Sequence, residues 1–181
     1  MTREAAPILK PESLQASSPA SSLGKNGKTE GKMLNLKKLS IRDKEIITDV
    51  FISVFTKEPW NDDWSDKNQL DMYINDLVGQ NYSLIYGLFD DDELIGIALG
   101  YVKHWYSGTE YIINELCIKT ERQGAGAGTF FLTEIEKAIK KLGIKQIFLL
   151  TDSNVPAFKF YKKNGFNAEE TTIPMVKRFG A

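Results

Sequence analysis

Three glycines at alternate positions stand out in the stretch ERQGAGAGTFF, residues 121–131, directly before an apolar run with helical spacing. A strand, a glycine-rich turn and a helix start together present unpaired backbone N–H groups in front of the helix dipole. Such an arrangement binds anionic phosphate. Glycine also lets the backbone approach its ligand closely. The stretch therefore predicts a phosphate-binding turn.

The spacing of these glycines argues against two common nucleotide sites. A Walker loop needs Lys and then Ser or Thr after its last glycine, whereas Gly128 is followed by Thr129 and Phe130. The dinucleotide fingerprint needs a third glycine three residues after the second, and the glycines here lie at 124, 126 and 128. ATP or GTP hydrolysis is therefore not expected. A glycine turn that merely connects two elements is the alternative.

Two ordered motifs carry a family resemblance. Gln123, Gly126 and Gly128 fit the pattern Gln/Arg-x-x-Gly-x-Gly/Ala. Downstream, an Asn-x-x-Ala-x-x-aromatic-Tyr pattern followed by Gly-Phe is matched by Asn154, Ala157, Phe160, Tyr161, Gly165 and Phe166. The sequence thus resembles the GNAT superfamily of acyl-CoA N-acyltransferases, over roughly Leu34 to Phe179. The resemblance implies an α/β fold, with a mixed, mostly antiparallel sheet of six to seven strands flanked by about four helices.

The resemblance also implies acetyl-CoA as co-substrate and a role for several residues. Its pyrophosphate is expected to bind Gln123, Gly124, Ala125, Gly126, Ala127, Gly128 and Thr129. The backbone of Leu116, Cys117 and Ile118 is expected to bind pantetheine and the thioester oxygen, where donors stabilise developing oxyanion charge. Asn154 and Ala157 are expected to contact the cofactor, and Tyr161 to give a proton to the leaving sulfur. Lys159, Lys162 or Lys163 can meet the ribose phosphate, although an exposed helix face explains them equally well.

Proton removal from the acceptor is the second chemical requirement, because an amine must lose its charge before it attacks the thioester. Glu115 is the ionisable candidate and can act directly or through water. Strand alternation places Asn114 and Glu115 on opposite faces, so only one can point into the acceptor channel. Some relatives carry an acid at the position of Asn114. A paired or solvent-facing Glu115 is the alternative.

The acceptor is predicted from acids and aromatic residues. In KEPWNDDWS and just beyond it, Glu58, Asp62, Asp63 and Asp66 surround Trp60 and Trp64, and Trp105 ends a strand. Acids beside aromatic faces suit a polyamine-like cation. We expect acceptor contacts from Trp60, Asp62, Asp63, Trp105, Asn114 and Glu115. The layout resembles aminoglycoside 6'-N-acetyltransferases, so an amino-sugar antibiotic is the first candidate. Protein, peptide or polyamine acetylation, a non-catalytic acyl-CoA sensor, and a solvated acidic loop with core tryptophans are the alternatives.

Amino-acid composition argues against several classes of ligand and binding partner. Cys117 and His104 are the single cysteine and histidine, so neither a disulfide nor a Cys/His zinc site is predicted, and no metal is expected. Cys117 is expected to be a small buried residue and His104 to cap or pack at a strand end. The net charge of −1 argues against nucleic acid, and no apolar run predicts a membrane span. We expect a cytoplasmic protein with a small-molecule amine as partner and, as an option, a homodimer.

Hydrophobic periodicity predicts the first half of the domain. A strand at residues 34–39 is followed by a helix that Ser40 and Asp43 begin, and a second helix is capped by Ser65. Strands at 82–89 and 93–105 form a hairpin around the acidic turn at residues 90–92.

The second half is predicted around the phosphate turn. A strand at 110–118 precedes it, and the following helix ends at Gly143. A buried strand at 146–151, a short helix ended by Asn164 and Gly165, and a last strand at 171–179 complete the domain. The strands at 110–118 and 146–151 are expected to be parallel neighbours, with the cofactor entering where they diverge. Residues 1–32 are rich in Ser, Gly and Lys and are expected to be a disordered leader or an artificial extension before an N-acetyltransferase domain at 33–181.

Overall fold

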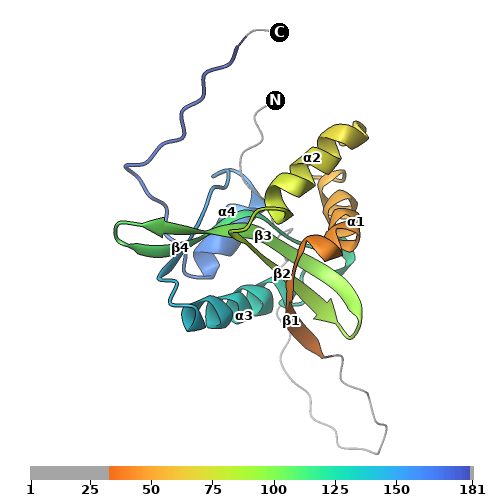
Figure 1. Cartoon of the computed structure of the whole chain (residues 1–181), viewed down its shortest axis with the longest axis horizontal. Helices are drawn as coiled ribbons and strands as arrows, with labels where there is room; N and C mark the ends of the chain where they lie inside the picture. The colour runs from red at the N-terminus through yellow and green to blue at the C-terminus, as the bar shows by residue number, and fades with distance from the viewer. Residues whose placement is uncertain (1–32, 180–181) are drawn as a thin grey trace, which may run out of the picture.

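The computed structural model describes residues 33–179, which form one mixed sheet with helices on both faces (Figure 1). The predicted leader at residues 1–32 lies outside the described residues. The strands are β1 (Leu34–Leu39), β2 (Ser83–Asp90), β3 (Glu93–Trp105), β4 (Gly108–Ile118) and β5 (Gln146–Leu149). The helices are α1 (Lys44–Phe55), α2 (Lys67–Val78), α3 (Ala127–Lys141) and α4 (Pro156–Lys163), with short 3-10 helices η1 (Ile41–Asp43) and η2 (Thr120–Arg122).

The sheet runs in the order β1-β2-β3-β4-β5. Strands β1 to β4 pair antiparallel, and β4 pairs parallel with β5 through the crossover that contains α3. The predicted fold class and the parallel pair are thereby confirmed. Within residues 33–179 the strand count is five, slightly below the predicted six to seven.

Helix starts and ends follow side-chain chemistry. The Ser40 hydroxyl oxygen accepts a hydrogen bond from the Arg42 N–H, and the Asp43 carboxylate accepts one from the Ser40 N–H. The predicted capping box is therefore confirmed. The predicted cap of α2 is wrong by one residue. Asp66 is the N-cap there, and its carboxylate accepts from the N–H groups of Asn68 and Gln69, whereas Ser65 lies one residue before the cap.

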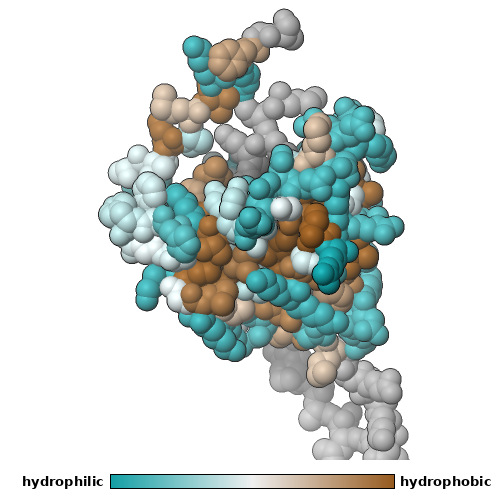
Figure 2. Space-filling view, viewed as in Figure 1, coloured by the Kyte–Doolittle hydropathy of each residue, from teal (hydrophilic) through white to brown (hydrophobic). Residues whose placement is uncertain are grey.

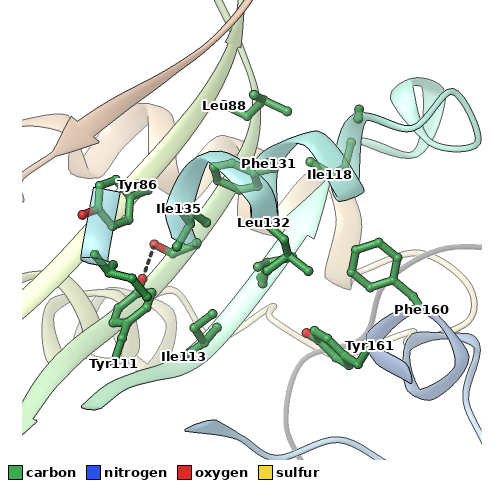
Figure 3. Close-up of a cluster of buried hydrophobic side chains, with 14 of the residues drawn as sticks. Tyr86, Leu88, Tyr111, Ile113, Ile118, Phe131, Leu132, Ile135, Phe160 and Tyr161 are labelled. Carbon is green, nitrogen blue, oxygen red and sulfur yellow. Dashed lines mark hydrogen bonds between the residues drawn. The ribbon is translucent and has the colours of Figure 1, made fainter. Parts of the chain in front are cut away.

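Two apolar clusters fill the two faces of the sheet. One joins α1 and α2 to the sheet through residues such as Phe51, Phe55 and Ile97. The other joins α3 and α4 to the opposite face through residues such as Phe131 and Tyr161 (Figure 3). The sheet thus brings the end of β4, the start of α3 and the helix α4 to one region.

Two expectations about the C-terminal part are wrong. Strand β5 is not fully buried, because its residues are intermediate or exposed and it forms an edge of the described sheet. Residues 171–179 form no strand. A β-favouring composition needs a paired neighbour to become a strand, and this segment runs away from the sheet (Figure 1). Within residues 33–179 no helix is long and apolar enough to span a bilayer.

Candidate active site

Strands β4 and β5 separate at their carboxyl ends. Their pairing runs from Glu110 opposite Gln146 to Ile113 opposite Leu149, and β4 then continues alone to Ile118. Among the described residues, the backbone of residues 114–118 therefore has no strand partner on the β5 side. Ligands of open α/β sheets bind at such carboxyl ends, where neighbouring chains diverge.

A bulge interrupts β4 at this same point. Leu99 lies opposite Glu115, whereas Gly100 lies opposite Ile113, so Asn114 is the extra residue. The alternation argument that placed Asn114 and Glu115 on opposite faces does not hold across a bulge. Glu115 faces α2, whereas Asn114 is half-buried.

The glycine segment has a backbone geometry that suits an anion. Gly124 and Gly126 have φ angles of 85° and 83°, which residues with a side chain rarely adopt. Gly126 is the N-cap of α3 and supplies no side-chain cap, so the first N–H groups of the helix lack intrahelical acceptors. A Cβ on either glycine would meet no described atom within 4 Å, and the first turn of α3 carries no acid. Amides, helix dipole and open space together fit a diphosphate.

An ion-pair network fixes the chain just before this turn. The Arg122 guanidinium lies 2.7 Å from Asp90 and 2.7 Å from Glu93, and Lys119 lies 2.8 Å from Glu93. These bonds tie η2 to the β2–β3 hairpin. Gln123 adds a bond from Nε2 to the Ile118 carbonyl at 2.8 Å, so its amide braces the turn against the end of β4.

Tyr161 points from α4 toward β4 (Figure 3). The residue is 2% exposed, and its hydroxyl has no hydrogen-bond partner within residues 33–179. Burial raises the pKa of the phenol far above its ordinary value of 10, and the nearby Glu115 and Cys117 raise this pKa further. The hydroxyl thus stays protonated at neutral pH, and the negative charges of Glu115 and Cys117 act on it from β4.

Glu115 is buried and held by a residue that the sequence did not single out. Its Oε1 accepts a hydrogen bond from the Tyr73 hydroxyl on α2. Tyr73 stacks on Trp64 with 5.1 Å between ring centroids, and Phe51 contacts both rings. Tyr73 lies in the apolar stripe of α2, so its spacing predicts only a core residue, and no local signal reveals its hydroxyl contact.

The loop between α1 and α2 lies beside the glycine turn that precedes α3. Glu58 and Trp60 line a small cavity together with Thr120, Gln123 and Pro156. Trp60 and Trp64 are both partly buried against the α1–α2 cluster, as expected for core tryptophans.

The acids of this loop differ in their roles. Hydrogen bonds from the Ser65 side chain and backbone lower the pKa of the exposed Asp63, which therefore stays charged at neutral pH. Asp62 is half-buried, whereas Asp66 is engaged as the cap of α2.

Some predicted residues do not join this region. Trp105 is exposed and lies opposite Gly108, at the start of β4. Glu115 lies seven residues further along β4, roughly 23 Å away at about 3.3 Å per residue. His104 lies at the same distant end, where its Nδ1 is 3.2 Å from the Thr109 hydroxyl.

The remaining predicted cofactor contacts lie on or near α4 and β4. Leu116, Cys117, Ile118 and Ala157 are buried, whereas Asn154 is exposed just before α4. The lysines Lys159, Lys162 and Lys163 are exposed on α4. The end of β4, the turn before α3 and Tyr161 on α4 therefore lie in one region of the fold.

Comparison with known proteins agrees with this arrangement. The profile of the Acetyltransferase (GNAT) family matches residues 45–166. A spermidine N(1)-acetyltransferase from Thermoplasma acidophilum is 28% identical over 151 residues, which cover 76% of this chain and 91% of the relative.

Solved structures share the fold. A soil-metagenomic aminoglycoside acetyltransferase in complex with sisomicin superposes with a TM-score of 0.63 at 21% identity, covering 81% of this chain and 97% of the other. AAC(6')-Iy in complex with a bisubstrate analogue, CoA-S-monomethyl-acetylneamine, superposes with a TM-score of 0.63 at 13% identity, covering 81% and 99%. With a family profile that spans most of the chain and a matching fold, the protein belongs to the GNAT family of acetyltransferases.

Proposed function

We propose that this acetyltransferase moves the acetyl group of acetyl-CoA to a primary amine of a small polycation, the class that includes polyamines and aminoglycosides. The observation that carries the proposal is the buried and protonated Tyr161 hydroxyl, which belongs to the apolar cluster between α3, α4 and β4, the strand whose end β5 leaves unpaired. The proposed catalytic domain covers residues 33–181, in a cytoplasmic protein.

The proposed cofactor path uses backbone more than side chains. The N–H groups from Gly124 to Thr129 bind the diphosphate, helped by the α3 dipole. The edge of residues 114–118 that β5 does not pair binds the pantetheine arm by main-chain hydrogen bonds. Acetyl-CoA, when bound, supplies the acetyl group as a thioester whose carbonyl carbon the amine attacks. The amides of β4 then donate to the carbonyl oxygen as charge develops on it.

Glu115 removes the amine proton in this proposal, directly or through water. Tyr73 holds this carboxylate through Oε1, which fixes the orientation of the carboxylate plane. The amine nitrogen forms the new C–N bond as this proton leaves.

Tyr161 gives its proton to the CoA sulfur as the C–S bond breaks, and it regains one from solvent after product release. Its raised pKa keeps the donor protonated. A thiol titrates near 8.5, so full proton transfer from a phenol with a higher pKa is uphill and is least so once the C–S bond has broken. Its main contribution is therefore a hydrogen bond that strengthens in the transition state.

The acidic loop supports a cationic acceptor. Asp62 and Asp63 follow Trp60, next to the cavity that borders the phosphate turn, and Asp63 stays charged at neutral pH. Two further findings support it: the Thermoplasma acidophilum relative is named for spermidine, and the two solved structures compared above contain an aminoglycoside or an aminoglycoside-derived bisubstrate analogue. Trp105 is left out because of its distance from Glu115.

The deciding experiment is a thiol-release assay with acetyl-CoA and a panel of spermidine, sisomicin and peptides with free N-termini. Mass spectrometry of each acceptor reports the added acetyl group. The proposal predicts turnover with the small polycations at micromolar to millimolar KM. Turnover with peptides alone would favour a protein acetyltransferase, and acetyl-CoA binding without turnover on any amine would favour a sensor.

A further inference from the structure

Arg122, the last residue of η2, lies directly before the glycine turn and ties it to the β2–β3 hairpin. The guanidinium binds two carboxylates of the hairpin. Its Nη1 lies 2.7 Å from Oδ2 of Asp90, and its Nη2 lies 2.7 Å from Oε2 of Glu93. The Asp90 side chain is only 4% exposed, so this ion pair is largely removed from water.

Lys119 adds a second anchor at the other end of η2. Its ammonium lies 2.8 Å from Oε1 of Glu93, and its backbone N–H donates to the Ile95 carbonyl at 2.8 Å. Lys119 and Arg122 are three residues apart, and side chains with this spacing lie above one another on a 3-10 helix. One carboxylate therefore binds both cations and fixes the rotation of η2 about its axis. We call Lys119, Arg122, Asp90 and Glu93 the hairpin clamp.

The hairpin that carries the two carboxylates lies at the lower right of Figure 1. Figure 2, seen from the same side, shows hydrophilic side chains over that part of the surface. The clamp thus joins a polar edge of the sheet to the start of the turn, and Arg122 reaches Glu93 across 29 positions of sequence.

The glycine turn cannot fix its own position through side chains. Residues 124–128 read Gly-Ala-Gly-Ala-Gly, so none of them carries a side chain that can form a hydrogen bond. A Cβ on Gly124 or Gly126 would meet no described atom within 4 Å. Glycine also has more backbone freedom to lose than any other residue. The amides are therefore placed from outside the turn, by α3 on one side and by Gln123 and the hairpin clamp on the other.

The gain from the hairpin clamp is direction more than stability. Burial of a carboxylate and a guanidinium costs desolvation, and two packed apolar side chains are often as stable as a buried ion pair. A planar guanidinium that binds two carboxylates at once is fixed in one orientation, which a lysine could not achieve. Hydrogen bonds from Lys119 and then from Arg122 lower the pKa of Glu93, so its carboxylate stays charged at neutral pH.

We propose that Arg122 is a positioning residue for acetyl-CoA: held by Asp90 and Glu93, it orders the glycine turn before the cofactor binds and thereby raises the affinity for the diphosphate. This role rests on the proposed function, in which the turn is the diphosphate site. A loop that is ordered in advance loses less conformational entropy on binding. Both Nη atoms are engaged by the hairpin, so Arg122 acts through the turn and does not itself bind the phosphate.

The test is calorimetric titration of acetyl-CoA, together with steady-state kinetics, for Arg122→Gln, Asp90→Asn and the double variant. Each single substitution should raise both the Kd and the KM for acetyl-CoA about tenfold, with kcat at saturating acetyl-CoA within about twofold of the wild type. The double variant should bind no more weakly than Arg122→Gln, because the two residues act as one unit. Arg122→Lys keeps the charge but cannot bridge both carboxylates, so it should restore the affinity only in part.

Asp90→Asn separates positioning from a direct phosphate contact. This variant keeps the charge of Arg122 and removes a negative charge near the turn. A direct contact would then be unchanged or stronger, whereas a displaced turn binds acetyl-CoA more weakly. If Arg122→Gln does not fold, Glu93→Gln gives the same comparison, because that side chain is 45% exposed, and its Kd should rise about threefold.

Two control variants report on effects unrelated to the turn. Lys140→Gln removes an ion pair with Glu136 on α3, and Tyr111→Phe removes a buried hydrogen bond to the Leu84 carbonyl. Both should bind acetyl-CoA as the wild type does. Equal or tighter binding by a folded Asp90→Asn, or a fall in kcat with an unchanged KM for acetyl-CoA, would overturn the positioning role. A wild-type protein that binds no acetyl-CoA would overturn the proposed function, and the positioning role with it.

Discussion

Replacing Tyr161 by phenylalanine should make the protein more stable and a much poorer enzyme. The substitution removes one oxygen and keeps the ring. That oxygen is buried and lacks a hydrogen-bond partner among residues 33–179. Its desolvation therefore lowers the stability of the folded protein, and no hydrogen bond offsets this loss. Such a group costs about 1–3 kcal/mol. Its removal should raise the melting temperature, by about 2–4 °C for each kcal/mol in a chain of this size.

The kinetic effect should have the opposite sign. Removal of one preorganised donor that acts on developing charge lowers kcat by about 10²–10³-fold. Affinity for acetyl-CoA should change little, because the phosphate turn and the edge of β4 remain. The assays are scanning calorimetry, thiol release at saturating acceptor, and a CoA binding isotherm.

Tyr111→Phe is the matched control. Tyr111 is also fully buried, but its hydroxyl donates to the Leu84 carbonyl at 2.9 Å (Figure 3). The same chemical change should here lower stability by about 1 kcal/mol and leave kcat unchanged. Equal kcat in wild type and Tyr161→Phe, or a lower melting temperature for Tyr161→Phe, would refute the reasoning.

Three further substitutions test other parts of the site. Tyr73→Phe should lower kcat about tenfold, because Glu115 loses the bond that orients it, while Tyr73→Phe combined with Glu115→Gln should be no slower than Glu115→Gln alone; additive losses would contradict this. Joint replacement of Asp62 and Asp63 by Asn should raise the KM for a polycation and make that KM less dependent on salt concentration, while the KM for acetyl-CoA stays unchanged. An unchanged KM for the polycation would show that this loop is not part of the acceptor site. Hydrogen bonds, from Lys119 first and then from Arg122, lower the pKa of Glu93 from 4.5 to about 2. The charged Glu93 therefore stabilises the folded protein fully above pH 4.5, and this stabilisation is lost as the pH falls toward 2. Thermal melts of Glu93→Gln should depend less on pH across that range than melts of the wild type, and identical profiles would argue against the network.

The glycine turn and the helix start that follows it could be predicted because their chemistry is local. Alternate glycines before a helical run permit the positive φ that Gly124 and Gly126 adopt, and a glycine at the N-cap leaves the first amides of the helix without a side-chain cap. The capping box of Ser40 and the parallel pair around α3 were predictable for the same reason: short-range hydrogen bonds and the handedness of crossovers decide them.

Features that depend on distant partners could not be predicted. The Tyr73 hydroxyl finds Glu115 across 42 positions of sequence, and Arg122 reaches Glu93 on the β2–β3 hairpin. The bulge at Asn114 depends on how closely β3 approaches β4. A Cβ on Gly100 would lie 2.2 Å from the Ile112 carbonyl oxygen, so that approach requires glycine.

The strand predicted at 171–179 also failed because it depends on a distant partner. Its apolar residues and period favour a strand, but no neighbour in the described part of the chain pairs with it. Composition indicates that a segment can form a strand, whereas only a partner makes it one.

Calorimetric titration of acetyl-CoA into the folded protein tests the central claim most directly. Binding of acetyl-CoA to the amides of the turn around Gly126 should release or absorb a saturable heat, and Gly126→Val should abolish this heat. Valine cannot hold a φ of 83° without strain, and its side chain would enter the space above the amides. Absence of heat with the wild-type protein, or equal affinity in a well-folded Gly126→Val, would contradict the account.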